Sequence, residues 1–554
     1  MKVTHLLLSA VALGALGCPE TPPPPPPPNP PQAFLTLKEN NVMGEAITGT
    51  VNVSGCKTVA QVQILQQDTF LYDVMWDPKK TPNTFTLPAS LFVNYYPRLG
   101  IAASLTLKAK VVCDDGRTNN STPVGVKFFP IAKKYAGPGG EQLVPDAFVA
   151  EGGVGGAANT FLGCVRTMTG TTIARVDTTG QLLGFVGSMP FDCSLATGIT
   201  DLSTTSGYRW VFEPNVGAFA LCLSSACGNF SVGKVVRSNK AARIGVGKSG
   251  TAVIWLNETG TNNKLVKVAP GAADTSNDWE YRFTYAVLLN ADPLVDEGAG
   301  QAVWISRWEF DMGTKIANIV PYRIDLRTGV LTNGVVPPNN DPAVIVQQQY
   351  PLSDVSEPIM PEGFFSPNGD LFTIPLLSYA QDNTVQTTVI SCGTGSGLCN
   401  GGSSARRWTS PTFPGMLRLV LPYSQSNIYA AIGPYQVWFL AAQTGVILNL
   451  GEKAIAPSGS NLVIGVAPGG GTDFYVLTGP DLGANPSFAS EIIAVDSPQA
   501  GELWRVGFGS GESPNNAMTL AVDANNQPWI RAGTELVKPL SNTEYRNARG
   551  PTMP

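Results

Sequence analysis

Short apolar runs separated by Gly-rich turns recur along most of the chain, and the clearest set lies between residues 461 and 509. Leu462–Ala467 is one apolar run, Asp473–Thr478 is a second, Glu491–Asp496 is a third and Glu502–Phe508 is a fourth. Runs of this length, rich in Val, Ile and aromatic residues and bounded by turn residues, are typical of β-strands. Four such strands joined by turns predict one antiparallel meander, the unit of a β-propeller blade, which must stack on copies of itself.

A turn followed by an aromatic-rich run, the expected second strand of each unit, recurs eight times at intervals of about forty to seventy residues. We therefore expect an eight-bladed β-propeller over residues 141–540, with seven blades as the alternative if two weak units share one blade. The eighth unit has only three strands and ends near Thr534–Lys538, so we expect Gln142–Pro145 to supply its outer strand. The eight runs are Asn159–Val165, Gly207–Phe212, Thr251–Leu256, Gln301–Ile305, Asp370–Ile374, Asn427–Ile432, Asp473–Leu477 and Gln527–Ile530.

Residues 33–130 follow a different pattern, with strands that alternate apolar and polar side chains. In the segment Leu105–Cys113, the apolar residues Leu105, Leu107 and Val111 alternate with polar ones, which predicts a strand with one buried face. The length and the number of strands favour an immunoglobulin-like β-sandwich. Residues 131–141, with Gly and Pro, are expected to be the linker to the propeller.

The first 32 residues are expected to export and anchor the protein. Leu6–Gly17 is an apolar run too short to span a bilayer, and it has the length of a signal-peptide core. It ends in Ala15-Leu16-Gly17-Cys18, which resembles the lipobox of bacterial lipoproteins. The resemblance implies cleavage after residue 17 and fatty acylation of Cys18. Because Pro19 rather than Asp follows, similarity to lipoprotein sorting signals implies the outer membrane, on its periplasmic or its cell-surface face.

Residues 18–32 form a proline-rich linker, with seven consecutive prolines from Pro22 to Pro28. Proline fixes φ and lacks a backbone N–H, so we expect polyproline II here. At about 3.1 Å per residue this linker extends on the order of 40 Å and holds the folded part away from the lipid surface.

The composition narrows the possible functions. The only histidine is His5, inside the predicted signal peptide, so the mature chain has no histidine for Ser-His-Asp or Cys-His catalysis or for metal ligation. Charged residues are 14% of the chain, the net charge is −5, and no basic cluster occurs. Nucleic acid is therefore not an expected partner.

The eight cysteines after Cys18 form an even set without a C-x-x-C spacing. In an exported protein such a set predicts structural disulfides. Proximity in sequence suggests the pairs Cys56–Cys113, Cys164–Cys193, Cys222–Cys227 and Cys392–Cys399.

The segment AVDSPQAGELW (Ala494–Trp504), and more faintly the segments from Arg175 and Arg323, resemble the repeat of quinoprotein-like (PQQ-like) β-propellers. That family includes quinone-dependent dehydrogenases, whose vicinal disulfide has no counterpart here because no two cysteines are adjacent. It also includes lipid-anchored, eight-bladed scaffold lipoproteins of the outer membrane. The resemblance therefore implies a propeller fold and favours a scaffold over a dehydrogenase, and no cofactor is expected.

A few side chains are candidates for chemistry, each with a structural alternative. Asp292, Asp296 and Glu297 could act as acid and base on a glycan, although acidic residues in propeller loops more often hold turns. Trp304 and Trp308 could stack on a sugar, but Trp304 is expected in the core. Asp523 and its neighbours could bind Ca²⁺ or, more simply, form a turn.

The sequence thus predicts a lipid-anchored cell-envelope protein whose propeller binds a protein partner or an envelope polysaccharide. No catalytic residue and no metal ligand is assigned. The alternative is a hydrolase or lyase that acts on polysaccharide through carboxylates in the propeller loops.

Overall fold

The computed structural model describes residues 29–549 of the chain, with gaps, as an all-β protein. The chain divides into two compact units: residues 1–37, 48–86 and 106–124 form the first, and the remainder forms the second. The stretches outside the description are 1–28, 38–39, 43–45, 89–90, 93–103, 130, 135–141, 151–159, 169, 178–180, 194–197, 200–206, 225–229, 258–262, 272–277, 284–286, 299, 333–343, 350–359, 381, 383, 395–398, 400–405, 418, 424–427, 458–460, 481–489, 508–517, 524, 533–534 and 550–554.

The first unit is built from two antiparallel groups of strands. One contains β1 (Gln32–Leu37), β3 (Ile47–Ser54) and β6 (Asn83–Leu87), and the other contains β4 (Val59–Gln66), β5 (Thr69–Val74), β7 (Ser104–Cys113) and β8 (Thr118–Asn120). Side chains in β1 and β6 alternate between buried and exposed, so each strand turns one face to a core. Val51, Val62, Ile64, Leu107 and Val111 are fully buried in this unit. The strand β2 (Asn40–Val42), which lies between β1 and β3 in the chain, pairs in parallel with β9 (Val124–Phe129).

The described part of the second unit contains eight small sheets, numbered here 1 to 8 in chain order, with antiparallel pairing throughout. Sheet 1 comprises β11 (Gln142–Ala150), β12 (Thr160–Thr167), β13 (Gly170–Asp177) and β14 (Leu182–Phe185), and sheet 2 comprises β15 (Gly198–Ile199), β16 (Tyr208–Glu213), β17 (Gly217–Cys222) and β18 (Ser231–Arg237). Sheet 3 comprises β19 (Ala241–Val246), β20 (Ala252–Leu256), β21 (Lys264–Val268) and β22 (Trp279–Arg282). Sheet 4 comprises β23 (Leu288–Leu289), β24 (Leu294–Asp296), β25 (Ala302–Asp311), β26 (Ile316–Asp325) and β27 (Val346–Gln349).

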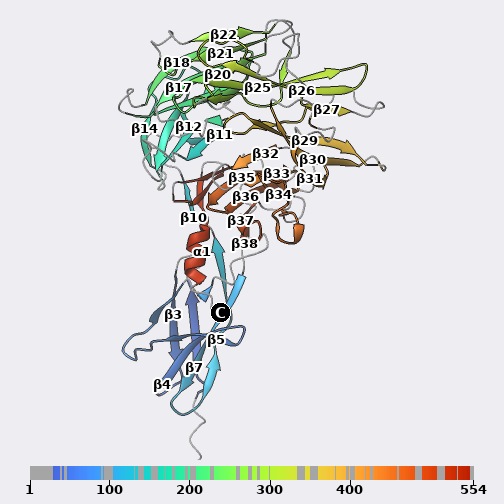
Figure 1. Cartoon of the computed structure of the whole chain (residues 1–554). Coiled ribbons are helices and arrows are strands. Elements are labelled where there is room, and N and C mark those ends of the chain that lie inside the picture. The colour runs from blue at the N-terminus through green and yellow to red at the C-terminus, as the bar shows by residue number, and fades with distance from the viewer. Residues whose placement is uncertain are drawn as a thin grey trace, which may run out of the picture. The chain divides into compact units, whose positions relative to one another are not determined.

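Sheets 5 to 8 continue the series. Sheet 5 comprises β28 (Phe364–Phe365), β29 (Leu371–Tyr379), β30 (Val385–Gly393) and β31 (Arg406–Pro414), and sheet 6 comprises β32 (Leu419–Tyr423), β33 (Ile428–Gly433) and β34 (Gln436–Ala441). Sheet 7 comprises β35 (Asn461–Gly470), β36 (Asp473–Pro480), β37 (Glu491–Ser497) and β38 (Gly501–Gly507). Sheet 8 comprises β39 (Met518–Val522), β40 (Pro528–Ala532) and β41 (Glu535–Lys538), joined by β10 (Ile131–Lys134). In Figure 1 the last strands β14, β18, β22, β27 and β31 lie toward the outside and first strands such as β11 and β35 lie nearer the middle.

Each predicted aromatic-rich run coincides with the second strand of one sheet. Among them, all five residues of β20 are buried, as are Phe474–Thr478 in β36. A strand with both faces buried must lie between two neighbouring sheets. The apolar runs therefore predict not only strands but also their sandwiched position.

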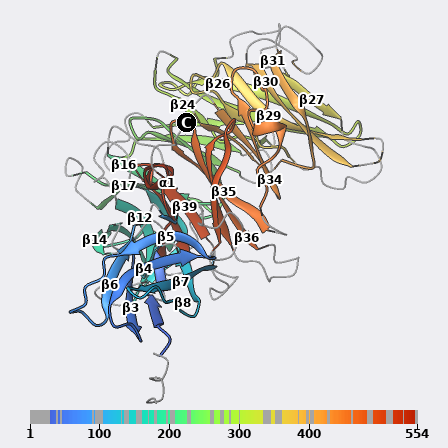
Figure 2. The same cartoon turned by 90° about the horizontal axis from the view of Figure 1, so that it is seen from below.

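Hydrophobic clusters join neighbouring sheets. Leu162 and Ile173 of sheet 1 pack with Phe219 of sheet 2, and six further clusters include contacts of the same kind along the chain. The last sheet also packs against the first, since the rings of Phe161 and Trp529 meet edge to face with their centroids 5.4 Å apart. Figure 2 likewise places β12 near β39. The second unit is therefore propeller-like, with its two ends in contact.

The strand that completes sheet 8 differs from the prediction. Ile131–Lys134 pairs antiparallel with Glu535–Lys538, whereas Gln142–Pro145 belongs to the first strand of sheet 1. The residues expected to be a linker thus begin with a strand. Sequence pattern could not assign it, because four residues on a sheet edge carry no periodicity that separates them from a loop.

A short helix follows sheet 8, where no helix was predicted. The helix α1 (Asn542–Arg549) packs on β37 of sheet 7. Arg546 donates to both oxygens of Asp473, at 2.9 and 2.7 Å, and also to Asp496. Asn542 donates its Nδ2 to the carbonyl of Val495 at 3.0 Å. The helix therefore ties the end of sheet 8 to sheet 7.

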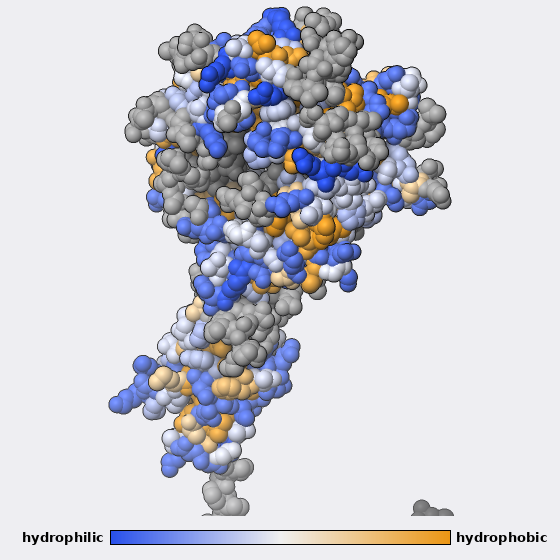
Figure 3. Space-filling model, viewed as in Figure 1, coloured by the Kyte–Doolittle hydropathy of each residue, from blue (hydrophilic) through white to orange (hydrophobic). Residues whose placement is uncertain are grey.

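Three predicted disulfides are confirmed: Cys56–Cys113, Cys164–Cys193 and Cys392–Cys399. The fourth pair, Cys222–Cys227, includes a residue outside the described part of the chain, as does the expected lipidation site Cys18. On the surface, the face seen in Figure 3 is mixed, with hydrophobic residues in separate small groups.

Candidate functional site

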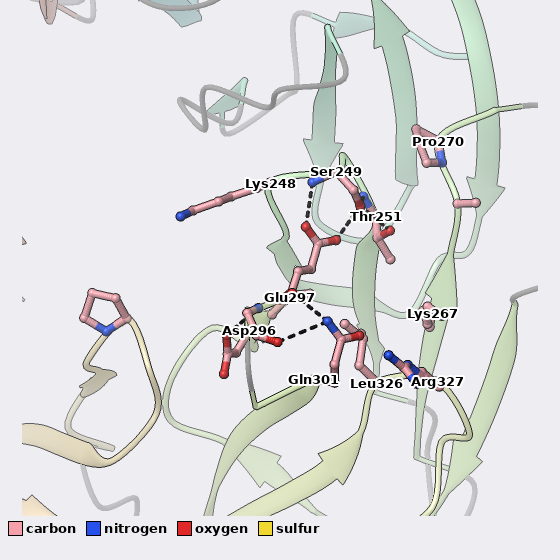
Figure 4. A pocket seen from close by; sticks show the side chains of 14 residues that line it. Lys248, Ser249, Thr251, Lys267, Pro270, Asp296, Glu297, Gln301, Leu326 and Arg327 are labelled. Carbon is pink, nitrogen blue, oxygen red and sulfur yellow. Dashed lines mark hydrogen bonds between the residues drawn. The ribbon is translucent and has the colours of Figure 1, made fainter.

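A recess of about 800 Å³ lies at one end of sheets 3, 4 and 5 (Figure 4). It is built from the turns β19–β20, β24–β25 and β28–β29 and from the segments that follow β21 and β26. These are all connections between first and second or between third and fourth strands, which antiparallel pairing brings to the same end of a sheet. The lining residues are Lys248, Ser249, Thr251, Lys267, Ala269, Pro270, Val295, Asp296, Glu297, Gly298, Gln301, Leu326, Arg327 and Pro367.

The β19–β20 turn is closed by its own backbone. Gly247 donates to the carbonyl of Thr251 at 2.8 Å, and Gly250 donates back to Gly247 at 3.0 Å. Gly250 has φ of +87°, a conformation that favours glycine. A Cβ at Gly247 would lie 2.5 Å from the Glu297 carboxylate, so glycine is also needed there for the close approach of sheet 4. This turn presents Ser249 to the recess.

Ser249 and Glu297 join the turns of two neighbouring sheets. The Ser249 backbone N–H donates to Glu297 Oε2 at 2.6 Å, and the Ser249 hydroxyl donates to Glu297 Oε1. Both carboxylate oxygens of Glu297 are therefore engaged within the protein (Figure 4). A carboxylate held in this way serves as a bridge between turns.

The β24–β25 turn uses its other acidic residue in a similar way. Asp296 Oδ1 accepts the N–H of Gly298 at 2.9 Å. Gln301 donates its Nε2 to the carbonyls of Glu297, at 2.6 Å, and of Gly298, at 3.1 Å. The polar side chains of this turn thus fix its backbone, as expected for Asp and Gln in tight turns.

The cationic residues Arg327 and Lys267 come from third strands and the turns that follow them. Arg327 lies in the turn after β26, where Asp325 Oδ1 accepts the N–H groups of Arg327 and Thr328 at 3.0 and 2.8 Å. Hydrogen bonds from Thr328, first of all from its backbone, hold the pKa of Asp325 below its usual range. Trp279 Nε1 of sheet 3 donates to the carbonyl of Leu326 at 2.9 Å. The turn that carries Arg327 is therefore fixed from two sides.

The Arg327 side chain itself is exposed, and within the described residues its guanidinium donates no hydrogen bond to the protein. Lys267, on β21, is buried, whereas Lys248 is exposed on the β19–β20 turn. In Figure 4 Arg327 and Lys267 lie on one side of the Glu297–Ser249 bridge and Lys248 extends on the other. The recess is thus lined by three cations and two carboxylates.

Asp292 lies apart from Asp296 and Glu297, at the opposite end of β24. Arg243 donates to Asp292 at 3.2 Å, to Glu362 at 2.9 Å and to the carbonyl of Leu289 at 3.0 Å. The many protein atoms around Asp292 raise the pKa of its carboxyl, and the charge of Arg243 opposes this rise. Asp296 and Glu297 line the recess, whereas Asp292 is not among its lining residues. The three carboxylates predicted as a catalytic set therefore do not converge.

The tryptophan pair is not a sugar-stacking surface. β25 extends to Asp311, so Trp308 lies inside this strand. Trp308 is only 8% exposed and belongs to the core cluster between sheets 4 and 5, where it stacks on Phe310. Trp304 packs against the same cluster.

The possible Ca²⁺ site is a turn. Asp523 Oδ1 accepts the N–H groups of Asn525 and Gln527, at 2.8 and 3.0 Å, and its Oδ2 accepts Trp529 Nε1 at 3.1 Å. Across the described ranges no group of three or more His, Cys, Asp or Glu side chains is placed to hold a metal ion. In the same ranges, no helix has the length and apolar character needed to cross a bilayer.

Sequence reasoning found Asp296 and Glu297 but missed Lys248, Lys267 and Arg327. These three cations are separated by 19 and 60 residues and lie in three different turns or strands. No motif connects them, and only the stacking of sheets 3 and 4 brings them together. The only sequence feature that points to any of them is the expected turn between the third and fourth strands of a repeat, which contains Arg327.

The sequence matches no protein-family model and no curated protein. Among solved structures, similarity extends to a chain of the Mitotic Checkpoint Complex, with 12% identity over 64% of this chain and 97% of that chain and a TM-score of 0.34. Sqt1 from Chaetomium thermophilum has 9% identity over 74% of this chain and 99% of that chain, with a TM-score of 0.43. The uncharacterized protein lmo1340 from Listeria monocytogenes EGD-e has 8% identity over 72% and 92%, with a TM-score of 0.30.

Proposed function

We propose that this protein is a lipid-anchored cell-envelope binding protein, in which sheets 1 to 8 are the blades of an eight-bladed β-propeller. The packing of successive sheets, and of sheet 8 on sheet 1, supports this reading. Pairing of β10 with β41 supports a ring completed by strands from both ends of the repeat region. Such closure packs the first and last repeats on each other, so that neither leaves an apolar face exposed.

The N-terminal unit is proposed to be an immunoglobulin-like β-sandwich that serves as a spacer. Its two groups of strands, each with a buried face, and the Cys56–Cys113 disulfide support this assignment. The proline-rich linker and acylated Cys18 would precede it and fix the protein to the outer membrane.

The observation that carries a binding role is the state of the carboxylates in the recess. Glu297 accepts two hydrogen bonds from Ser249 and Asp296 accepts one from Gly298, so both are used to hold turns. A general acid or base needs carboxyl oxygens that are free to reach the substrate, and both oxygens of Glu297 are already bound to Ser249. The exposed guanidinium of Arg327 supplies charge for recognition instead.

Two measurements in the native cell envelope test the proposal. Metabolic labelling with an alkyne fatty acid should mark the full-length protein and should fail for Cys18→Ala. A photo-crosslinking amino acid at position 248 should capture one dominant envelope component. The same amino acid at Met168, which is 91% exposed between the second and third strands of sheet 1, serves as the control and should not. An unlabelled wild type would refute the anchor, and equal capture at both positions would refute recognition through the recess.

A further inference from the structure

We infer that the recess between sheets 3 and 4 binds an acidic sugar residue, a uronate, within a polysaccharide. This inference rests on the proposed binding function and specifies its ligand. It is carried by the exposed Arg327 guanidinium, by the size and mixed polarity of the recess, and by the hydrogen bonds that already occupy backbone groups of the turns that line it.

The positive charge that the recess offers to a ligand is that of Arg327. Lys248 and Lys267 also line the recess, but both have interactions of their own within the protein. The carboxylate of Glu297 is occupied at both oxygens by Ser249, which further reduces what it offers to a ligand. By contrast, the Arg327 guanidinium is held on a fixed turn and, in the described ranges, has no hydrogen-bond acceptor of its own. A guanidinium binds a carboxylate through two parallel hydrogen bonds.

The size and the mixed polarity of the recess match a saccharide. Its volume of about 800 Å³ falls within the range of pockets that hold small ligands. The Thr251 hydroxyl, which is hydrogen-bonded to Ser249 Oγ at 2.7 Å, and the second carboxylate oxygen of Asp296 can each accept a hydrogen bond from a sugar hydroxyl. Val295, Leu326 and Pro270 provide apolar wall for the C–H faces of a sugar ring. One exposed guanidinium, that of Arg327, corresponds to one carboxylate on the bound sugar.

An acidic peptide fits this recess less well. Peptides that bind to β-structure usually pair their backbone with a free sheet edge. Here the turn backbone is already paired: Gly247 donates to Thr251, and the carbonyls of Glu297 and Gly298 accept from Gln301. The recess therefore offers side chains to a ligand but little backbone.

The test uses the full-length protein in detergent and isothermal titration with trisaccharides of galacturonate, glucuronate and mannuronate. Each acid is compared with its methyl ester, which keeps the sugar ring and removes the charge. We expect at least one acid to bind about tenfold more tightly than its ester. Arg327→Gln should weaken binding of the acid about tenfold and leave the ester unchanged. Arg327→Lys, which keeps the charge but loses the two parallel hydrogen bonds, should weaken binding of the acid by a smaller factor. Arg407→Gln, which changes an exposed arginine of β31 outside the recess, should bind as the wild type does.

The outcomes separate this inference from the proposed function. Equal affinity for acid and ester, or an equal loss in Arg327→Gln and Arg407→Gln, would overturn the uronate assignment. So would a lack of binding to all three acids, or Arg327-dependent binding of an acidic hexapeptide in their place. In each of these cases, specific crosslinking at position 248 would still support recognition through the recess. The proposed function would be refuted only if this specific crosslinking also failed.

Discussion

Glu297 and Ser249 form a two-point contact between neighbouring sheets, in which one carboxylate accepts both the backbone N–H and the hydroxyl of the serine. Glu297 directly follows the short strand β24 of sheet 4, and Ser249 lies in the β19–β20 turn of sheet 3. The contact holds together two of the turns that line the recess. It also explains why an acidic residue in this position need not take part in chemistry.

The first prediction concerns this contact. Glu297→Gln replaces one acceptor oxygen by an amide NH₂, which cannot accept a bond from Ser249. Because a hydrogen bond to a charged group contributes about 1.5 kcal/mol or more, the Ser249 amide should exchange its hydrogen about tenfold faster. Hydrogen–deuterium exchange of the peptide covering residues 245–253 measures this. Glu452→Gln, on an exposed carboxylate, is the control. Unchanged exchange in Glu297→Gln would show that the contact contributes nothing to the turn.

The second prediction concerns the attachment of α1 to sheet 7. Arg546→Ala removes the partner of Asp473, whose side chain is 11% exposed, and leaves that carboxylate poorly compensated. We expect the free energy of unfolding to fall by about 1–2 kcal/mol. This is less than for a fully buried ion pair, because Arg546 is itself partly exposed. Limited proteolysis should then cleave the C-terminal segment faster than in Asn547→Ala, which changes an exposed residue of the same helix. Equal cleavage rates would refute a role for α1 in holding sheets 7 and 8 together.

Much of the architecture follows from the sequence because its strands are sandwiched. Runs such as Ala252–Leu256 are apolar on both faces, and this requires sheets on both sides. The closing strand Ile131–Lys134 and the helix Asn542–Arg549 were not predicted. Both are short and lie at the ends of the repeat region, and their partners are distant in sequence. Local pattern carries no information about such partners.

The third prediction concerns pH and Glu213, which is 4% exposed at the end of β16. Burial raises the pKa of Glu213, and the charge of Asp192 raises it further. A carboxyl whose pKa is raised in the folded state does not lower the free energy of unfolding below its unfolded-state pKa of about 4.3. It lowers the free energy of unfolding as the pH rises through its folded-state pKa. Glu213→Gln should therefore raise the melting temperature at pH 7, and the gain should vanish below about pH 4. A gain that is constant with pH would contradict this account.

The fourth prediction ranks the disulfides. The pairs Cys56–Cys113, Cys164–Cys193 and Cys392–Cys399 enclose sequence separations of 57, 29 and 7 residues. In the chain-entropy model, their removal costs about 4, about 3.5 and about 2 kcal/mol respectively. Paired Cys→Ser variants, each followed by thermal unfolding of the unit that contains the bond, measure the two bonds of the second unit directly. A larger loss for 392–399 than for 164–193 would show that native packing, and not loop length, sets the order.

The site was less predictable than the fold. The sequence drew attention to Asp296 and Glu297 because acidic pairs are conspicuous in a weakly charged chain, but their roles depend on Ser249 and Gly298, which carry no such signal. Arg327 and Lys248 are 79 residues apart and share a recess only through the stacking of two sheets. Such a cluster cannot be read from spacing along the chain.

The account depends most on the claim that the recess holds its ligand and does not react with it. The direct measurement is to incubate the full-length protein with the uronate trisaccharides for a day and to quantify bound, free and shortened saccharide by mass spectrometry. We expect a bound fraction that depends on Arg327, with the trisaccharide recovered intact. Shortened or unsaturated saccharide, formed by the wild type and lost in Asp296→Asn and Glu297→Gln, would contradict the account and identify a hydrolase or lyase.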